Sequence, residues 1–304
     1  MKKFYANGKL LLTGEYFVLD GAQALAIPTK YGQGLIVEER ADQGLKWESY
    51  DEDGNCWFQH TYPHFNNQSD DPIIDRLRDI LNAIQTLNPS FQHHHKVVST
   101  HLTFPRNWGL GTSSTLIALL SQWADVNPFE LLEKTFGGSG YDIACAISNS
   151  PILYQLEKKE KLIIPTYETT SFDPPFKEKL YFVYLDKKQN SRKGIQQYKA
   201  KQKPTDKTIN EISNLTQKIK NVRKLLNFEL LLKKHEQIVS KQIGLATIQS
   251  THFNYYWGVV KSLGAWGGDF VLATSHKPYE ETKAYFNEKG FKTFLRYEEM
   301  VLEH

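Results

Sequence analysis

The sequence contains little cysteine, and this excludes two kinds of protein. Cys56 and Cys145 are the only cysteines in 304 residues. Two thiols in dissimilar settings form neither the disulfide framework of a small secreted domain nor a cysteine-based metal site. We therefore expect a reduced, cytoplasmic setting. The length allows one large or two moderate domains at about 150 residues each.

The sequence also has no long apolar run. No segment approaches the roughly 20 apolar residues that a membrane-spanning helix requires. The apolar stretch near the N-terminus is interrupted by Asn7, Lys9 and Glu15, so we expect no signal peptide and no membrane partner. The formal net charge of +3 is close to balance, which argues against nucleic acid as the main partner.

The sequence lacks the P-loop pattern G-x-x-x-x-G-K-[ST]. It has instead a glycine- and hydroxyl-rich segment from Pro105 to Thr115 that runs into an apolar, helix-like stretch. Glycine lets the backbone approach an anion closely, and a helix that starts there points unpaired N–H groups at the anion. The segment predicts a phosphate site formed by Gly109, Leu110, Gly111, Thr112, Ser113 and Ser114. The alternative is an ordinary helix start capped by a hydroxyl.

Hydrophobic periodicity predicts an α+β chain with an antiparallel sheet. In the first part we expect strands at 10–12, 16–19, 34–38 and 96–104, and helices at 71–87, at 116–124 and from Asn127 onward, where Asn-Pro-Phe-Glu is a good helix start. In the second part we expect a strand at 180–185, a basic loop, helices within 207–244, a strand at 270–274, a helix at 279–288 and a strand at 292–296. The stretch 165–175, rich in Pro, Ser and Thr, suggests a domain boundary.

Three segments together resemble the motif set of the GHMP kinases, named for galactokinase, homoserine kinase, mevalonate kinase and phosphomevalonate kinase. They are Ala6–Leu19, the glycine-rich segment and Lys261–Phe270. A fourth segment, Gly138–Ala144, resembles the family's S-G-x-D motif, and its last five residues spell GYDIA, the peptide that names one subgroup. Gly14-Glu15-Tyr16 and the Gly-Gly-Asp of the third segment are closest to the mevalonate and phosphomevalonate kinases.

The resemblance implies a fold and a chemistry. The fold is the two-domain GHMP kinase fold, with an N-terminal mixed α/β nucleotide-binding domain at 1–168 and a C-terminal ferredoxin-like α/β sandwich at 169–304. The cofactors are ATP and Mg²⁺, and the reaction is transfer of the γ-phosphate to a small anionic metabolite. The resemblance does not decide the oligomeric state, and a homodimer stays open.

The resemblance also assigns catalytic roles. Asp142 matches the aspartate that accepts the proton of the attacking hydroxyl, and Lys9 matches the lysine that balances charge beside it. Taken alone, Asp142 would be a helix N-cap and Lys9 a surface lysine. Ser113 aligns with the serine that contacts Mg²⁺ or phosphate. The family's metal-binding glutamate has no counterpart at its usual spacing, which leaves Glu130 and Glu133; we favour Glu133, because Glu130 has a capping role at its helix start.

The substrate side is predicted from several short segments. Its members are Glu15, Ser139, Ser191, Arg192, Lys193 and Gly267. Ser191 to Lys193 follow a predicted strand, where phosphomevalonate kinases place a substrate-side Ser/Thr loop, and the excess of basic residues between Lys177 and Lys207 suits an anion. A solvated basic loop is the alternative for this segment. For Glu15 the alternative is a structural glutamate that bonds the neighbouring loop.

Two positions depart from the family pattern. Asn7 stands where a proline is usual, and Trp266 stands where the third motif normally has glycine. The indole either costs this loop part of its role or walls off a pocket. We expect a small-molecule kinase acting on mevalonate or phosphomevalonate. The alternatives are a diphosphomevalonate decarboxylase-like enzyme, which uses the same ATP site and aspartate, and a non-catalytic protein that binds a metabolite or a protein partner.

Overall fold

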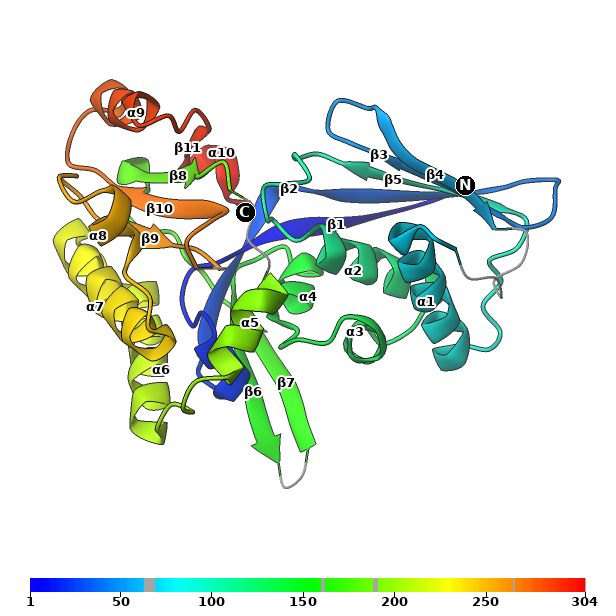
Figure 1. Ribbon diagram of the computed structural model, residues 1–304, viewed down its shortest axis with the longest axis horizontal. Coiled ribbons are helices and arrows are strands. Elements are labelled where there is room, and N and C mark those ends of the chain that lie inside the picture. The colour runs from blue at the N-terminus through cyan, green and yellow to red at the C-terminus, as the bar shows by residue number, and fades with distance from the viewer. Residues whose placement is uncertain (63–68, 160–161, 188–190, 265, 304) are drawn as a thin grey trace. The chain divides into compact units, whose positions relative to one another are not determined.

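The structure is a computed structural model that describes residues 1–62, 69–159, 162–187, 191–264 and 266–303. It divides into two compact units (Figure 1). The first unit comprises Met1–Gly8, Tyr31–Arg106 and Leu110–Ile147, and the second comprises Lys9–Lys30, Asn107–Gly109 and Ser148–His304. Compact units need not coincide with domains, so the boundary expected between residues 168 and 169 stays a prediction.

The first unit contains a mixed sheet whose strands follow the order β4-β3-β5-β2, with β1 paired to β2. Its strands are β1 (Lys2–Leu11), β2 (Ala24–Glu39), β3 (Leu45–Tyr50), β4 (Cys56–Tyr62) and β5 (Lys96–Leu102). Residues 33–39 of β2 pair antiparallel with β5, while β3 pairs parallel with β5. Strands β1 and β2 continue into the second unit, where residues 24–26 of β2 pair with β6.

Four helices cover one face of this sheet (Figure 1). They are α1 (Pro72–Leu87), α2 (Thr112–Ala124), α3 (Pro128–Thr135) and α4 (Tyr141–Ala146). Helices α1 and α3 begin alike: Asp71 and Asn127 accept hydrogen bonds from first-turn N–H groups, and a proline follows each of them. Helix α2 is apolar almost all round and packs against α3 and α4. The core between helices and sheet includes Leu35, Trp47, Val98, Ile80 and Ile117.

The second unit is built on a fully antiparallel sheet with strand order β11-β8-β10-β9. These strands are β8 (Leu180–Tyr184), β9 (Val260–Ser262), β10 (Phe270–Thr274) and β11 (Phe294–Arg296). A long hairpin, β6 (Ile152–Lys159) and β7 (Leu162–Thr169), continues from β2 and extends away from this sheet (Figure 1). The side chains on both faces of β8 and β10 are buried, and nearly all of them are apolar or aromatic.

The helices of the second unit lie on both sides of that sheet. They are α5 (Ser191–Lys199), α6 (Asp206–Asn221), α7 (Leu225–Ile243), α8 (Ile248–His252), α9 (Tyr279–Glu288) and α10 (Tyr297–Met300), with the 3₁₀ turns η1 (Phe17–Asp20) and η2 (Lys177–Lys179). Phe286 of α9 and Phe253 after α8 pack on the face that carries Tyr181 and Val183. Helix α7 lies against the other face and packs against α6 and β9. The resulting helix–sheet–helix arrangement confirms the expected α+β class.

Two local predictions were wrong. Residues 16–19 do not form a strand, because Gly14 (φ +86°) and Tyr16 (φ +60°) turn the chain and η1 follows. Alternation of apolar residues cannot reveal such positive φ values. The basic segment after β8 is not only a loop, because Ser191–Lys199 forms helix α5.

The cysteine and membrane expectations meet two observations. Cys56 is exposed, Cys145 is buried, and both are free thiols. Among the helices that the structure describes, none combines the length and apolar character needed to cross a bilayer.

Two glycines of β2 provide a matched test of the packing in the first unit. A Cβ on Gly32 would overlap the backbone carbonyl oxygen of Ala6, whereas a Cβ on Gly34 would lie 3.9 Å from the carbonyl oxygen of Phe4, an ordinary contact. We predict that Gly32→Ala lowers the free energy of unfolding by about 1–3 kcal/mol. Gly34→Ala should leave it within about 0.5 kcal/mol or raise it. Urea denaturation of both variants measures the difference, and equal midpoints would contradict the close approach of Ala6 in β1 to Gly32 in β2.

Candidate functional site

The second half of the glycine-rich segment begins helix α2. Gly111 is the N-cap with φ +101°, and no side chain of the described residues caps the helix, which contradicts the alternative of a hydroxyl-capped start. Ser114 is buried and donates to the Gly111 carbonyl (2.8 Å), whereas Ser113 is exposed. An α-helix leaves its first N–H groups without partners in the helix. The start of α2 therefore offers backbone donors and one solvent-facing hydroxyl, as anion binding requires.

The first half of the segment belongs to the second unit and is held from several sides. Lys9 Nζ donates to the Gly109 carbonyl (2.9 Å), and the Tyr184 hydroxyl donates to the Asn107 carbonyl (2.9 Å). Gly109 has φ +70°, and a Cβ there would overlap the Asp269 carboxylate. Glycine is thus required by its dihedral and by the close approach of the Gly-Gly-Asp motif.

Asp142 lies in the first turn of α4, in the first unit. Gly140, with φ +84°, is the N-cap of this helix, so the alternative that Asp142 is a cap is wrong. The Asp142 carboxylate is half-buried and accepts from the Ile143 N–H (3.1 Å). Ser139 is half-buried in the turn just before α4. Lys9 belongs to the other unit, and its pairing with Asp142 stays a prediction.

The predicted metal ligands are open to solvent. Glu130 and Glu133 are both exposed on α3, which packs against α2 with its exposed Ser113. Among the described residues, no three His, Cys, Asp or Glu side chains cluster so as to hold a metal ion. Mg²⁺ usually binds proteins through one or two carboxylates and completes its shell with water and substrate phosphates. The residues present fit that mode, and the choice of Glu133 stays a prediction.

Glu15 lies at the centre of a buried polar cluster in the second unit, formed by Glu15, His235, Glu236 and Lys261. Glu15 Oε1 accepts from Lys261 Nζ, and both side chains have no exposed area. Lys261 also donates to the Ser262 carbonyl (2.8 Å), and Glu236 Oε1 lies 3.7 Å from Lys261 Nζ. His235 Nε2 accepts from the Gly14 N–H (3.0 Å). These contacts favour the structural alternative for Glu15 over a substrate contact.

Burial shifts the protonation of this cluster. Burial raises the pKa of Glu236 to about 8. The nearby Lys261 lowers this pKa, whereas the charge of Glu15 raises it further. Burial raises the pKa of Glu15 as well, while contact with Lys261 opposes the shift. Burial, and then the charge of Lys261, lower the pKa of His235 well below its usual value. At pH 7 Glu236 therefore holds a proton and His235 is neutral, so the charges of the cluster lie in the ion pair between Glu15 and Lys261.

Tyr16 and Trp266 join the first and third motifs. The Trp266 N–H donates to the Tyr16 hydroxyl (3.1 Å), and the indole Nε1 donates to the Ala246 carbonyl (3.0 Å). The Trp266 ring is buried in an apolar cluster with Phe17, Ala22, Tyr198, Ile212, Val239 and Ile243. The bulk of the tryptophan is thus taken up by the core of the second unit. Gly267, next along the chain, has φ +80° and is half-buried.

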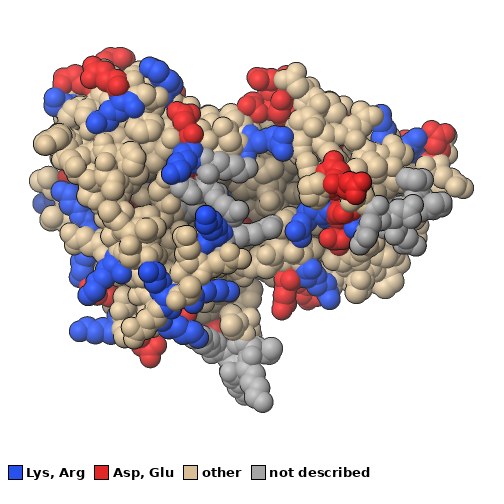
Figure 2. All heavy atoms as spheres, in the orientation of Figure 1, with Lys and Arg blue, Asp and Glu red and all other residues tan. Residues whose placement is uncertain are grey.

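The predicted substrate clamp lies at the start of α5. Lys193 is exposed, as are Lys199 and Lys201, while the side chains of Ser191 and Arg192 lie outside the described residues. Figure 2 shows Lys and Arg side chains gathered over the region of α5, α6 and α7. Anchored by Tyr198, whose hydroxyl donates to Asp20 (2.6 Å), the helix presents positive charge to solvent. A role in binding an anionic acceptor stays a prediction.

No protein-family model matches the sequence, and no curated protein matches it. Solved structures do. Phosphomevalonate kinase of Streptococcus pneumoniae, in complex with phosphomevalonate and AMPPNP, superposes with a TM-score of 0.71 at 16% identity over 97% of this chain and 100% of that one. Mevalonate kinase of Methanococcus jannaschii superposes with a TM-score of 0.69 at 13% identity, over 100% of this chain and 98% of that one. Galactokinase of Lactococcus lactis, complexed with galactose, superposes with a TM-score of 0.71 at 12% identity, over 97% of this chain and 92% of that one.

The chain has the GHMP kinase fold. Within this fold the sequence prediction gave no role to three residues that hold the motifs: Lys261, His235 and Glu236. Each of them carried a signal. His235 and Glu236 fall among the apolar positions of a predicted helix, beside Leu232 and Val239. Lys261 follows Val259 and Val260 in an apolar run, where a charge needs a buried partner.

The buried proton on Glu236 generates a prediction about stability and pH. A raised folded-state pKa adds stability that is complete below the unfolded value of 4.5 and is lost as pH rises through about 8. Glu236→Gln keeps the neutral form and removes this loss. We predict that the free energy of unfolding of the variant, relative to that of the wild type, rises by about 1 kcal/mol per pH unit between pH 5.5 and 7.5. Urea denaturation across this range measures the gain. Glu280→Gln, at an exposed position of α9, is the control. If the free energies of unfolding of wild type and Glu236→Gln changed in parallel with pH, Glu236 would not be protonated in the folded state.

Proposed function

We propose that this protein is an ATP- and Mg²⁺-dependent kinase of small anionic metabolites. The observation that carries the proposal is the start of α2, where Gly111 in a left-handed conformation precedes a helix that no described side chain caps. Backbone N–H groups, the helix dipole and the exposed Ser113 hydroxyl there suit the phosphates of ATP. The fold shared with three kinases of small metabolites supports the same conclusion.

In the proposed reaction an acceptor oxygen forms a bond to the γ-phosphorus while the bond from that phosphorus to the β-bridging oxygen breaks, and ADP leaves. Asp142 accepts the proton of the acceptor hydroxyl, and Lys9 balances the charge that develops on the phosphoryl group. Gly109 and Leu110 extend the phosphate cradle of Gly111 to Ser114. Ser113 and Glu133 would hold Mg²⁺, and the ion would supply positive charge to neutralise the phosphates.

The proposed acceptor is mevalonate or phosphomevalonate. The fold does not favour these over sugars, since the phosphomevalonate kinase and the galactokinase superpose equally well, with TM-scores of 0.71 each. The support comes from Gly14-Glu15-Tyr16, from Gly267-Gly268-Asp269 and from the basic start of α5 with Ser191, Arg192 and Lys193. A cytoplasmic location and a small anionic metabolite as the binding partner are part of the same proposal, and a homodimer stays open.

Nucleotide binding tests the phosphate site directly. We predict that Gly111→Val abolishes binding of an ATP analogue, because valine strains the positive-φ position from which the backbone donors of α2 start. The melting temperature should stay within a few degrees of the wild type. Isothermal titration with AMPPNP and Mg²⁺ measures the affinity. Gly137→Val is the control, since Gly137 also has positive φ but is exposed, and no described heavy atom lies within 4 Å of the place that a Cβ would take there. Unchanged affinity in Gly111→Val would remove the site from α2.

ADP release in the presence of candidate acceptors tests the reaction. We expect turnover with mevalonate or phosphomevalonate, and a loss of about 10²-fold or more in Asp142→Asn with AMPPNP binding retained. Turnover with galactose or homoserine alone would overturn the acceptor and leave the kinase standing. Binding of ATP without release of ADP in the presence of any acceptor would favour a non-catalytic protein. Release of CO₂ together with ADP would favour a decarboxylase.

A further inference from the structure

His235 accepts a hydrogen bond from the backbone of the first motif. Its side chain is fully buried, and its Nε2 lies 3.0 Å from the donating Gly14 N. A nitrogen that accepts carries no proton, so the neutral ring carries its proton on Nδ1. Glu15 Oε2 lies 3.4 Å from the same Nε2. A proton on Nε2 would therefore turn this nitrogen into a donor towards Glu15 and leave the Gly14 N–H unpaired.

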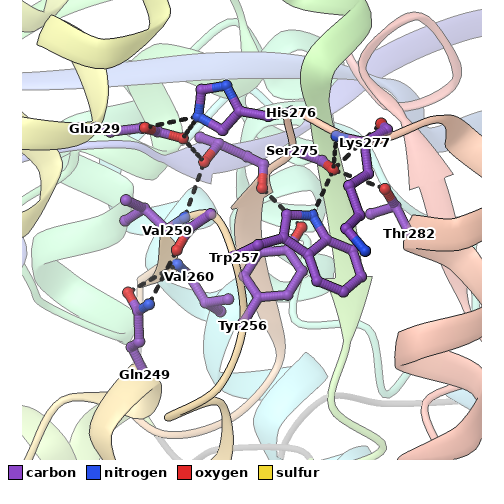
Figure 3. Close-up of polar contacts among 12 residues, drawn as sticks. Glu229, Gln249, Tyr256, Trp257, Val259, Val260, Ser275, His276, Lys277 and Thr282 are labelled. Atoms are coloured by element: carbon purple, nitrogen blue, oxygen red, sulfur yellow. Dashed lines mark hydrogen bonds and ion pairs between the residues drawn. The ribbon is translucent and has the colours of Figure 1, made fainter.

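Helix α7, which carries His235, is fixed on the sheet two turns earlier in the chain. Glu229 accepts from the Thr274 hydroxyl (2.5 Å) and lies 3.0 and 3.1 Å from Nε2 of His276 (Figure 3). The Thr274 hydroxyl in turn accepts from the Val259 N–H (2.9 Å). These bonds tie α7 to β10 and to the segment before β9. The position of the imidazole is therefore restrained by contacts other than its hydrogen bond with Gly14.

The turn that His235 holds is strained and closely packed. Gly14 has φ +86°, and a Cβ there would lie 2.7 Å from Cβ of Ala24. Tyr16, which is not a glycine, has φ +60°. A positive φ in a residue with a side chain, as at Tyr16, persists when surrounding contacts over-determine it. His235 and Lys261 supply two such contacts, one to the backbone of the turn and one to the side chain of Glu15.

Tyr16 passes the position of this turn to helix α5. Its ring stacks on Tyr198 with the ring centroids 5.4 Å apart, and a Cβ on Gly194 would lie 2.8 Å from the Tyr16 hydroxyl. That hydroxyl also accepts from the Trp266 N–H. A shift of the Gly14–Tyr16 turn thus moves both the basic helix α5 and the backbone of the third motif.

We infer that His235 is a positioning residue for the acceptor side of the site, acting through the hydrogen bond from Gly14 to its Nε2 and through the stacking of Tyr16 on α5. The inference rests on the proposed function for the role of α5, whereas the link from His235 to Gly14 stands on its own. His235 contacts no reacting atom in this assignment. It fixes the turn against which α5 packs.

The link is tested without activity, by NMR and hydrogen exchange on the full-length chain. The ¹⁵N shifts of His235 should report a protonated Nδ1 and an unprotonated Nε2 at pH 7. The Gly14 amide should exchange up to about tenfold faster in His235→Leu, which removes the acceptor, and near the wild-type rate in His235→Gln, whose Oε1 restores it. His252→Leu, exposed on α8, is the control. A protonated Nε2, or equal Gly14 exchange in wild type and His235→Leu, would overturn the inference.

Kinetics with phosphomevalonate and mevalonate test the consequence. His235→Leu should raise the KM for the acceptor by up to about tenfold, the equivalent of one lost hydrogen bond, while kcat and the KM for ATP stay within about twofold. His235→Gln should recover the KM. If His235→Leu does not fold, the tautomer and the exchange in His235→Gln still decide. A loss of kcat alone, or no recovery, would overturn the positioning role. A wild type inactive on every acceptor would end the proposed function and leave the exchange result intact.

Discussion

The second unit depends on one buried ion pair, between Glu15 and Lys261. Taking two charges out of water costs several kcal/mol per ion, and only close mutual contact offsets this, so loss of either partner leaves an uncompensated charge in the core. The two residues are 246 positions apart in the chain. Their contact therefore joins the segment after β1 to strand β9. The Gly14–Tyr16 turn, helix α7 and the third motif all meet around it.

The neighbours of this pair are arranged to keep the cluster near electrical neutrality. A second ionised carboxylate beside Glu15 would exceed the single positive charge of Lys261, and burial raises the pKa of Glu236 to about 8, so this side chain keeps its proton. A charged imidazole would add a second cation, and burial lowers the pKa of His235. One carboxylate and one ammonium remain, the smallest set of charges that these four side chains can carry while Glu15 and Lys261 stay paired.

The sequence was sufficient where local chemistry decides the structure. Helix α3 was predictable from an Asn followed by proline, and α1, α6, α7 and α9 from their apolar periodicity. The fold was predictable from the three motifs, each a short segment that contains two or more glycines. The strand expected at residues 16–19 failed because positive φ at Gly14 and Tyr16 depends on packing against Ala24, His235 and Lys261, partners that no local pattern contains. The role of each predicted site residue likewise depends on groups far away in the sequence.

The third motif shows how a departure from a family pattern is accommodated by packing. Trp266 stands where glycine is usual, yet its backbone N–H still donates to Tyr16, and its ring enters an apolar cluster with Phe17 and Tyr198. The neighbouring Asp269 closes against Gly109, where only a residue without a side chain fits. Because backbone donors, and not the side chain of Trp266, make the link between the motifs, the substitution changes the volume of the core and leaves the linking hydrogen bonds in place. The constraint that the fold retains is therefore on backbone position, and Gly109 and Gly14 are two of the places where an added Cβ would overlap a neighbouring atom.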